Sequence, residues 1–388
     1  MMDVNVELKP LHNEQEINQQ WLEKMLSQKF GCSVAVNFWS STLPRSGEGF
    51  LSEIALVNIE YTVNDNKQKE IRLVFKFLPK DTNLKSFLAN GGLAKREVEF
   101  YHFTSSPKFQ EVFHKTGVSL PVPEAYYAGF TEEAITIVMR DLSVDKYKSV
   151  IVRDGSTLSQ TKTALQAVAL VHAAGVIYLQ KHKQNDGLGA LAADFNTDFM
   201  DQFFIPNLNT LSEMYKGSSL AKTFRALIPL TKQIRSTSKR YPLLNTVVHG
   251  DLWAGQLLYS EDESSANLID WQFCHVSNPV SDIMSMFFMS SDPEIFEENL
   301  DEILESYWHT FTETVTAGGA SVDITLEQLM INIEEMWMHG FMVLAVSIHD
   351  FLSADNISES RLFRAFNFLE KKGVFKRFLA KFGNQEEA

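Results

Sequence analysis

The sequence predicts an α+β protein with a smaller, strand-rich part at 1–140 and a larger, mainly helical part at 141–388. A chain of 388 residues is long enough to form two domains. Short apolar runs bounded by turn residues are frequent before residue 140, whereas segments with helical spacing dominate after residue 157. This change of pattern places the expected domain boundary near Arg140.

The first part is expected to form a sheet accompanied by one long helix. Helical segments are expected at 17–30 and 94–104, the second of them carrying several charges. The predicted strands lie at 34–39, 52–63, 70–77, 125–130 and 134–139, and the third of them alternates apolar and polar residues through Ile71, Leu73 and Phe75. Pro121 and Pro123 interrupt the chain before the last two strands.

The second part is expected to be helical except around residues 247–272. The predicted helices lie at about 160–180, 197–215, 219–238, 280–290, 294–317, 325–351 and 358–381. The longest apolar segment, from Thr163 to Leu179, contains Gln166, His172 and several small residues. A buried helix is therefore favoured there over a membrane span.

The composition excludes some classes of partner. A net charge of −14 argues against nucleic acid, which needs a basic surface, and against anionic membranes. Cys32 and Cys274 form neither a disulfide framework nor a metal-binding spacing, and the N-terminal residues do not resemble a secretory signal. We therefore expect a soluble, cytoplasmic protein with no nucleic-acid or membrane partner and no evident protein partner.

Residues 247–272 carry the strongest functional pattern. An apolar strand leads into His249-Gly250-Asp251, Gln256 follows five positions after the aspartate, and a hairpin ends at Asp270. Phosphoryl transfer in protein-kinase-like enzymes needs one carboxylate for the nucleophile's proton, and an amide and a second carboxylate for magnesium. The segment therefore predicts an ATP- and magnesium-dependent phosphotransferase.

At this segment the chain resembles the aminoglycoside phosphotransferase/choline kinase superfamily, and within it the ecdysteroid-kinase-like (CHK kinase-like) proteins. The resemblance implies a bilobal protein-kinase-like fold with ATP and magnesium between a sheet-rich and a helical lobe. It implies transfer of the γ-phosphoryl group to a hydroxyl of a small lipophilic molecule, such as a steroid or xenobiotic alcohol. Choline-like and aminoglycoside-like acceptors are less favoured, and no activation segment for a protein substrate follows Asp270.

Lys76 stands alone in the apolar strand segment LVFKFL, where a charge needs a partner. It could be an edge-strand lysine that reaches solvent, or the lysine that binds ATP phosphates and pairs with a glutamate of the next helix. Glu97 and Glu99 are the candidate partners. The resemblance favours Glu97, which shortly precedes the aromatic pair Phe100-Tyr101.

Two further segments are candidates for nucleotide binding. Gly47, Gly49 and Phe50 lie between two predicted strands, where glycines allow a backbone to approach phosphates, although a plain hairpin turn is also consistent. Met139 lies in a segment that, by its position, looks like the interlobe linker that contacts adenine. Many relatives have an acidic residue where this chain has Arg140. Because the linker contacts adenine mainly through backbone groups, this difference should matter little.

The resemblance implies a role for each polar residue of the 249–282 region. Asp251 is the candidate catalytic base and Asp270 a candidate magnesium ligand. His249 is expected to brace the loop and is a second catalytic candidate. Asp282 occupies the position of an aspartate that supports the catalytic loop.

Gln256 departs from the family pattern H-G-D-x-x-x-x-N, in which asparagine supplies a magnesium ligand. Glutamine keeps the amide oxygen but moves it by roughly 1.5 Å, the length of a carbon–carbon bond. Magnesium tolerates poor octahedral geometry badly. An impaired pseudokinase that acts as a nucleotide- or ligand-binding scaffold is therefore the alternative function.

Two questions stay open at the level of the sequence. His249, Asp251, Asp270 and His275 could form a hydrolase metal cluster, but that hypothesis leaves Lys76 and Glu97 unexplained. The methionine- and aromatic-rich stretch 336–342 could line an apolar acceptor pocket or belong to the core.

Overall fold

The computed structural model describes residues 8–43, 52–64, 67–182, 187–192 and 200–383. The chain divides into two units, Met1–Pro107 with Val122–Tyr147 and Lys108–Pro121 with Lys148–Ala388. Residues 108–121 belong to the second unit because the backbone N–H of Leu268 donates to the carbonyl of Pro121 at 2.8 Å. Residues 141–147 continue the first unit because the N–H of Asp141 donates to the carbonyl of Arg72 at 3.1 Å.

The first unit is built on a five-stranded antiparallel sheet with the order β1-β2-β3-β5-β4. Its strands are β1 (Val34–Thr42), β2 (Glu53–Val63), β3 (Lys69–Phe77), β4 (Ala125–Phe130) and β5 (Ile135–Arg140). All five were predicted from the sequence, and this prediction is confirmed. Lys76 pairs with Ile54 of β2 on one side and with Ile137 of β5 on the other. It therefore lies in the central strand and not at an edge.

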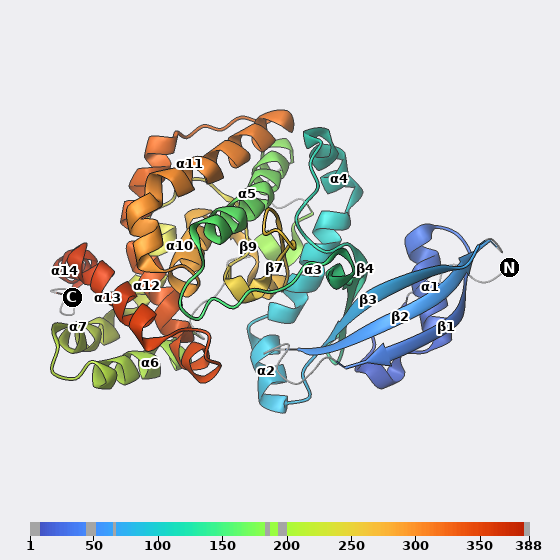
Figure 1. Ribbon diagram of the computed structural model, residues 1–388, viewed down its shortest axis with the longest axis horizontal. Helices are drawn as coiled ribbons and strands as arrows, with labels where there is room; N and C mark the ends of the chain where they lie inside the picture. Colours follow the sequence, from blue (N-terminus) through green and yellow to red (C-terminus); the bar gives the residue numbers. More distant parts are fainter. Residues whose placement is uncertain (1–7, 44–51, 65–66, 183–186, 193–199, 384–388) are drawn as a thin grey trace. The chain divides into compact units, whose positions relative to one another are not determined.

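Helix α1 (Gln19–Phe30) covers one face of this sheet (Figure 1). It begins where the side chain of Asn18 accepts the N–H of Trp21 at 3.0 Å, and it ends at Gly31, whose φ of 66° suits glycine. Its buried residues form one apolar stripe: Trp21, Leu22, Met25 and Leu26. The Trp21 ring lies 5.8 Å from that of Phe75, which anchors the helix on the sheet.

The remaining helical segments of this unit follow β3 or flank the sheet. They are α2 (Thr82–Asn90), α3 (Leu93–Ser105) and the short 3₁₀ turns η1 (Glu14–Glu16) and η3 (Leu142–Asp145). Helix α3 carries Glu97 on a buried face together with Phe100 and Tyr101.

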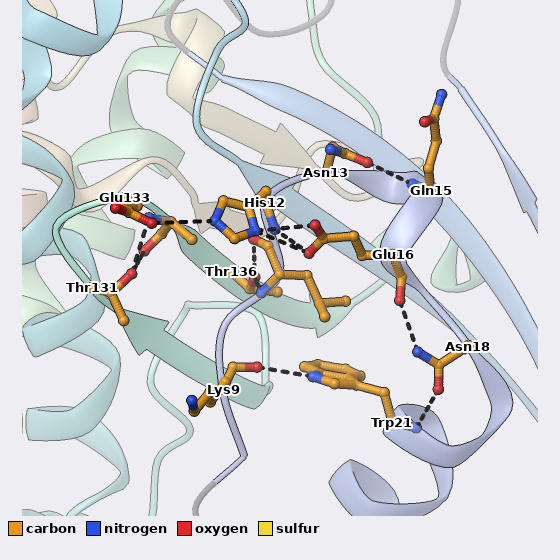
Figure 2. A network of polar contacts seen from close by, with 12 residues as sticks. Lys9, His12, Asn13, Gln15, Glu16, Asn18, Trp21, Thr131, Glu133 and Thr136 are labelled. Carbon is orange, nitrogen blue, oxygen red and sulfur yellow. Dashed lines mark hydrogen bonds and ion pairs between the residues drawn. The ribbon is translucent and has the colours of Figure 1, made fainter.

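The segment before α1 is joined to the sheet by polar contacts (Figure 2). The hydroxyl of Thr136 on β5 accepts the N–H of Leu11 at 2.6 Å and donates to the carbonyl of Leu11 at 2.9 Å. The indole N–H of Trp21 donates to the carbonyl of Lys9 at 3.0 Å. One hydroxyl thus satisfies both backbone groups of Leu11, a residue that belongs to no helix or strand.

The second unit is mainly helical. Its helices include the short α4 (Pro107–Phe113), which begins at the boundary, and α5 (Leu158–Lys181), α6 (Asp201–Met214), α10 (Val280–Met289), α11 (Pro293–Ala317) and α12 (Leu326–Ser353). Helices α5 and α12 each begin with a capping box, formed by Thr157 with Gln160 and by Thr325 with Gln328. Every residue of α10 is buried, which makes this helix the centre of the unit.

Two predicted helices are broken in the structure. The segment 219–238 forms α7 (Ser219–Leu227), the 3₁₀ turn η6 (Ile228–Leu230) and α8 (Thr231–Arg235), and α9 (Thr237–Arg240) follows. Pro229 interrupts it, because proline removes a backbone donor and clashes with the preceding turn. The segment 358–381 forms α13 (Glu359–Lys371) and α14 (Val374–Phe382), separated at Gly373 with φ 69°. The prediction of continuous helices was wrong at both places.

Helices α5 and α12 are long and apolar enough to cross a membrane by length and composition. However, 78% and 67% of their most apolar windows are buried inside the protein. This is the burial that core helices show.

Two short antiparallel ribbons interrupt the helices of the second unit. Strand β6 (Thr246–Val248) pairs with β9 (His275–Ser277), and β7 (Leu257–Tyr259) pairs with β8 (Ala266–Leu268). The 3₁₀ turns η7 (Ala254–Gln256) and η8 (Trp271–Phe273) connect them.

We expect Thr136→Val to lower the free energy of unfolding by about 1–3 kcal/mol, because two backbone groups of Leu11 lose their partner. Urea unfolding measures this change. Thr42→Val, the same substitution at an exposed strand position, is the control and should change little. Equal effects of the two substitutions would contradict the assigned role of the Thr136 hydroxyl.

Candidate active site

The β7–β8 ribbon brings distant residues of the 247–272 segment to one place. Gln256 directly precedes β7, and one residue separates the end of β8 from Asp270. Both residues therefore lie at the same end of the ribbon. The N–H of Ile269 donates to the carbonyl of Gln256 at 3.0 Å, which extends the pairing by one step. The ribbon therefore places side chains 14 residues apart in sequence next to each other.

The loop that carries Asp251 is held by the carboxylate of Asp282, from the first turn of α10. Asp282 accepts the N–H of His249 at 2.7 Å and that of Gly250 at 2.9 Å. Gly250 has φ 81°, and a Cβ there would lie 2.3 Å from the carbonyl oxygen of Phe273, so only glycine fits. Asp282 thus supports the loop, as predicted from the sequence.

Asp282 itself is held by two buried side chains from other helices. His172 of α5 places Nε2 3.1 Å from Asp282, and its Nδ1 lies 2.9 Å from the hydroxyl of Tyr307 on α11. Burial alone raises the pKa of Asp282, but the hydrogen bonds from His172 and His249 lower it below its ordinary value. Asp282 therefore stays an ionised acceptor for the loop.

The amide of Gln256 lies between the two predicted functional carboxylates. Its Nε2 is 3.4 Å from Oδ2 of Asp251 and 3.2 Å from Oδ2 of Asp270. The side-chain amide of Gln272 approaches the same oxygen of Asp270 at 3.5 Å. Two carboxylate oxygens thus converge on one point, which the amide nitrogen of Gln256 occupies.

The site concentrates negative charge. Burial, and after it the charge of Asp270, raises the pKa of Asp251 to about 8, although hydrogen bonds from Gln256 and Trp253 oppose this rise. Asp270 has φ 65° and ψ 67°, a left-handed conformation that is unfavourable for a residue with a Cβ. Perturbed carboxylates and backbone strain of this kind cluster at functional sites.

His249 is fully buried, and its ring contacts the backbone of both Asp251 and Ile269. Its Nδ1 accepts the N–H of Asp251 at 3.3 Å, and its Nε2 lies 2.9 Å from the carbonyl oxygen of Ile269. Because a carbonyl only accepts, Nε2 carries the proton and the imidazole is neutral. These contacts brace the loop, and direct participation of His249 in proton transfer stays a prediction.

The donor set suits magnesium better than a transition metal. Magnesium is commonly bound through one or two carboxylates together with phosphate oxygens, and Asp251, Asp270 and the amide of Gln256 offer such donors. To present its oxygen, the Gln256 amide must turn over, and this orientation is one that hydrogen bonding decides. Within the described ranges, no group of three or more His, Cys, Asp or Glu residues is placed to hold a metal, and the ring nitrogens of His249 are already engaged.

The first unit contains the predicted lysine–glutamate pair. Nζ of Lys76 on β3 lies 2.6 Å from Oε2 of Glu97 on α3, and both side chains are buried. Glu99, the other candidate, lies instead 3.5 Å from Lys95. The prediction that Lys76 pairs with Glu97 is confirmed, while its role in binding phosphates stays a prediction.

The remaining predicted nucleotide contacts are less well defined. Met139 is buried on β5, and its sulfur accepts a hydrogen bond from the hydroxyl of Tyr101 at 3.8 Å. Arg140 is exposed and forms an ion pair with Asp145 at 2.9 Å. Gly47, Gly49 and Phe50 lie outside the described residues.

The methionine- and aromatic-rich stretch of α12 lies in the core. Met336, Trp337 and Phe341 are almost completely buried, and the Trp337 ring packs 5.1 Å from that of Phe368. His339 is also buried, and burial lowers its pKa to about 4. The contacts of these residues favour core packing over an acceptor pocket for this stretch.

Three residues of the site were not identified from the sequence. Trp253 is half-buried, hydrogen-bonds the carboxylate of Asp251, and packs its ring 4.8 Å from that of Phe351 on α12. Ser290 accepts the N–H of Ala254 at 2.7 Å through its hydroxyl. The third residue is Gln272, through its amide contact with Asp270. Nothing in the local sequence patterns marks these contacts, because each depends on tertiary packing.

The first unit has a five-stranded antiparallel sheet and a buried lysine–glutamate pair, and the helical unit that follows carries the loop with Asp251. This combination defines the protein-kinase-like fold. The model of the ecdysteroid kinase-like family matches residues 46–319. The chain belongs to this family of small-molecule kinase-like proteins.

The individual proteins that the chain resembles share 25% or less sequence identity with it. Uncharacterized oxidoreductase dhs-27 of Caenorhabditis elegans is 25% identical over 345 residues, which are 80% of this chain, and the chain spans only 39% of that protein's length. Among solved structures, Plasmodium vivax ethanolamine kinase has a TM-score of 0.44 and 14% identity, covering 87% of this chain and 83% of that one. Choline kinase LicA from Streptococcus pneumoniae has a TM-score of 0.41 and 14% identity, covering 90% and 99%.

The burial of Asp251, together with the charge of Asp270, predicts a pH-dependent stability. The pKa of Asp251 is about 8 in the folded protein, and its ordinary value is 3.8. The protein is therefore most stable with respect to this group below about pH 4, where Asp251 is protonated, and it loses this stability as the pH rises to about 8. In magnesium-free buffer, Asp251→Asn should therefore raise Tm relative to wild type by a margin that grows between about pH 5 and pH 9. Thermal unfolding across this range measures the margin, at roughly 2–4 °C per kcal/mol.

The matched control is Asp262→Asn, in the turn between β7 and β8. Hydrogen bonds from Ser260 and Ser264 lower the pKa of Asp262, so this substitution should bring no gain in Tm as the pH rises. A margin for Asp251→Asn that stays constant across the pH range would contradict the raised pKa of Asp251.

Proposed function

We propose that this chain is an ATP- and magnesium-dependent phosphotransferase that moves the γ-phosphoryl group of ATP to a hydroxyl of a small lipophilic molecule. The observation that carries the proposal is the convergence of Asp251 and Asp270 on the amide of Gln256, at 3.4 and 3.2 Å. Membership of the ecdysteroid kinase-like family supports the same reaction class. Each unit contributes one part of the chemistry.

In the second unit, Asp270 and the amide oxygen of Gln256 would hold magnesium. The metal, when bound, neutralises the charge that develops on the phosphate oxygens. Asp251, whose pKa burial and then the charge of Asp270 raise in the free protein, would ionise more readily beside a bound cation. The strained backbone of Asp270 aims its carboxylate toward that of Asp251.

Asp251 orients the acceptor hydroxyl and accepts its proton. A loose transition state depends more on positioning than on basicity, so the main requirement is a rigid loop. The hydrogen bond from the Asp251 N–H to His249, and those from His249 and Gly250 to Asp282, provide this rigidity.

In the first unit, Lys76 binds the nucleotide phosphates, and Glu97 keeps its ammonium group charged and directed. A buried lysine without a partner would lose its proton, because burial disfavours the charged form. The 2.6 Å contact with Glu97 prevents this.

A lipophilic acceptor without negative charge is supported by the surroundings of Asp251. Trp253 presents an aromatic ring two residues from Asp251 and packs against Phe351. The charged groups that act on Asp251 are Asp270 and Asp282, both acidic, which disfavours an anionic acceptor. Alcohols with an apolar ring system, such as steroids, satisfy both conditions.

A scaffold without transferase activity is the second candidate, and Gln256 is the observation that favours it. Its amide nitrogen occupies the position between the carboxylates that a cation requires. If this amide cannot turn over, the protein binds nucleotide or ligand without transferring phosphate. Gln256→Asn, which restores the family pattern, should then create or raise the activity.

The test of the reaction is incubation of the full chain with labelled ATP, magnesium and a panel of ring-bearing alcohols. Asp251→Asn should lower kcat by about 10²–10⁴-fold with little change in ATP affinity. Lys76→Met should weaken ATP binding by about tenfold, because a charge-assisted contact to phosphate is lost. Calorimetric titration with ATP and mass spectrometry of the products measure these effects.

The control for Lys76→Met is Lys80→Met, at an exposed lysine of the same unit that lies 3.1 Å from Glu53. It should leave ATP binding unchanged. ATP binding by the wild type without any phosphorylated product across the panel, together with product formation by Gln256→Asn, would decide for the scaffold.

Trp253 should affect the acceptor and not the nucleotide. Trp253→Ala should raise KM for a lipophilic alcohol by about tenfold, because a large apolar contact is lost, while Trp253→Phe keeps most of it. Initial rates at varied alcohol and ATP concentrations separate the two KM values. An increase in KM for ATP alone would contradict an acceptor-side position for Trp253.

A further inference from the structure

The turn that carries Gln256 lacks a cap of its own. Turn η7 spans Ala254–Gln256, and Trp253, at its N-cap position, forms no side-chain cap. The first N–H groups of a helical turn have no partner within the turn, and a hydroxyl or carboxylate usually accepts them. Indole cannot do so, because it only donates.

A serine from another element supplies the missing acceptor. The hydroxyl of Ser290, the C-cap residue of α10, accepts the N–H of Ala254 at 2.7 Å. Ser290 is fully buried, so no solvent competes for this contact. The hydrogen bond thus caps the turn that ends in Gln256.

Both ends of α10 therefore hold the same loop. Asp282 at the start of α10 binds the N–H groups of His249 and Gly250, and Ser290 at its end binds that of Ala254. The two anchors are eight residues apart, which is roughly 12 Å along a helix. Asp251 lies between the anchored points, and Gln256 lies just after the second.

The end of α10 is in turn held by residues from two other segments. The N–H of Ser156 donates to the carbonyl of Ser290 at 2.8 Å. Nη2 of Arg361 on α13 donates to the carbonyl of Met289 at 3.0 Å. Arg361 is only 1% exposed, and Nε and Nη1 of its guanidinium have no hydrogen-bond partner among the described residues.

A buried guanidinium with so few partners is costly, because desolvation is poorly compensated. Burial lowers the pKa of Arg361 to about 10. Replacement of such a group by an apolar side chain of similar length is often neutral or stabilising. Global stability therefore does not explain this arginine well, and its contact with the end of α10 offers another explanation.

We propose that Ser290, held in place by Arg361, is a positioning residue for the phosphoryl-transfer loop and sets the place of the Gln256 amide. The inference rests on the proposed function for its catalytic consequence. Its structural part, the capping of η7 by Ser290, is measurable without any turnover.

The experiment compares Ser290→Ala with Ser291→Ala in the full chain. Ser291 is an equally buried neighbour, and its hydroxyl contacts Ser156, Thr161 and the carbonyl of Met286 but not the loop. Amide hydrogen exchange at Ala254 is followed by NMR in protein labelled with ¹⁵N-alanine. Ser290→Ala should speed this exchange by about tenfold relative to Ser291→Ala, because the hydrogen bond that protects the amide is lost.

Arg361→Met provides a second test if Ser290→Ala folds poorly. It should also speed exchange at Ala254, while Tm stays unchanged or rises. Arg361→Lys, which can still donate to the Met289 carbonyl, should remain close to wild type. Equal exchange at Ala254 in Ser290→Ala and Ser291→Ala, or wild-type exchange in Arg361→Met, would overturn the proposal.

Kinetics separate this inference from the proposed function. With an accepted alcohol, Ser290→Ala should lower kcat by about tenfold with KM for ATP changed less than about twofold, and Ser291→Ala should change neither. A kcat equal to that of Ser291→Ala would overturn the catalytic part. If even the wild type transfers no phosphate, the proposed function fails, and the exchange data still decide whether Ser290 positions the loop.

Discussion

The buried carboxylate of Asp282 is the contact on which the arrangement of the candidate site depends. A fully buried ion is tolerated only when hydrogen bonds replace its water, and Asp282 has donors at 2.7, 2.9 and 3.1 Å from His249, Gly250 and His172. Two of these donors are backbone groups of the loop itself. The loop therefore cannot move without leaving a buried charge unpaired, which makes its position as well defined as that of helix α10.

The site built on this anchor is electrostatically and conformationally unfavourable in the free protein. Asp251 and Asp270 repel each other at close range, and Asp270 adopts a backbone conformation that disfavours a side chain. Such features persist only where the surrounding structure imposes them. A cation would relieve the repulsion, so under the proposed function the features that destabilise the free site would favour a magnesium-bound nucleotide.

Side-chain amides have an unusual importance here. Gln256 and Gln272 both direct amide nitrogens at the carboxylate of Asp270. These neutral donors take the place that a cation would have in a metal-bound site. An amide can present either nitrogen or oxygen by turning over, which makes it compatible with both states. The extra methylene of Gln256 relative to asparagine gives its amide the reach to contact both carboxylates.

Much of the fold follows from local patterns that are visible in the sequence. Apolar segments between turn residues indicated all five strands of the sheet, and Asn18 and Gly31 mark the ends of α1. A lone lysine within an apolar strand indicated that Lys76 needs a partner, and the family resemblance favoured Glu97 over Glu99 for this pair. The breaks at Pro229 and Gly373 were missed because strong apolar periodicity continues across both residues.

The convergence of Asp251 and Asp270 was also predictable, because an aspartate on a loop and another after a hairpin lie at the same end of the ribbon. The sequence by itself therefore determined the types of elements, the lysine–glutamate pair and the main carboxylates. Only the tertiary structure decided that Asp282, His172 and Ser290 hold the loop, and that Trp253 lies against Phe351. The physical reason is that local patterns depend on near neighbours, whereas these contacts join segments that only long-range packing brings together.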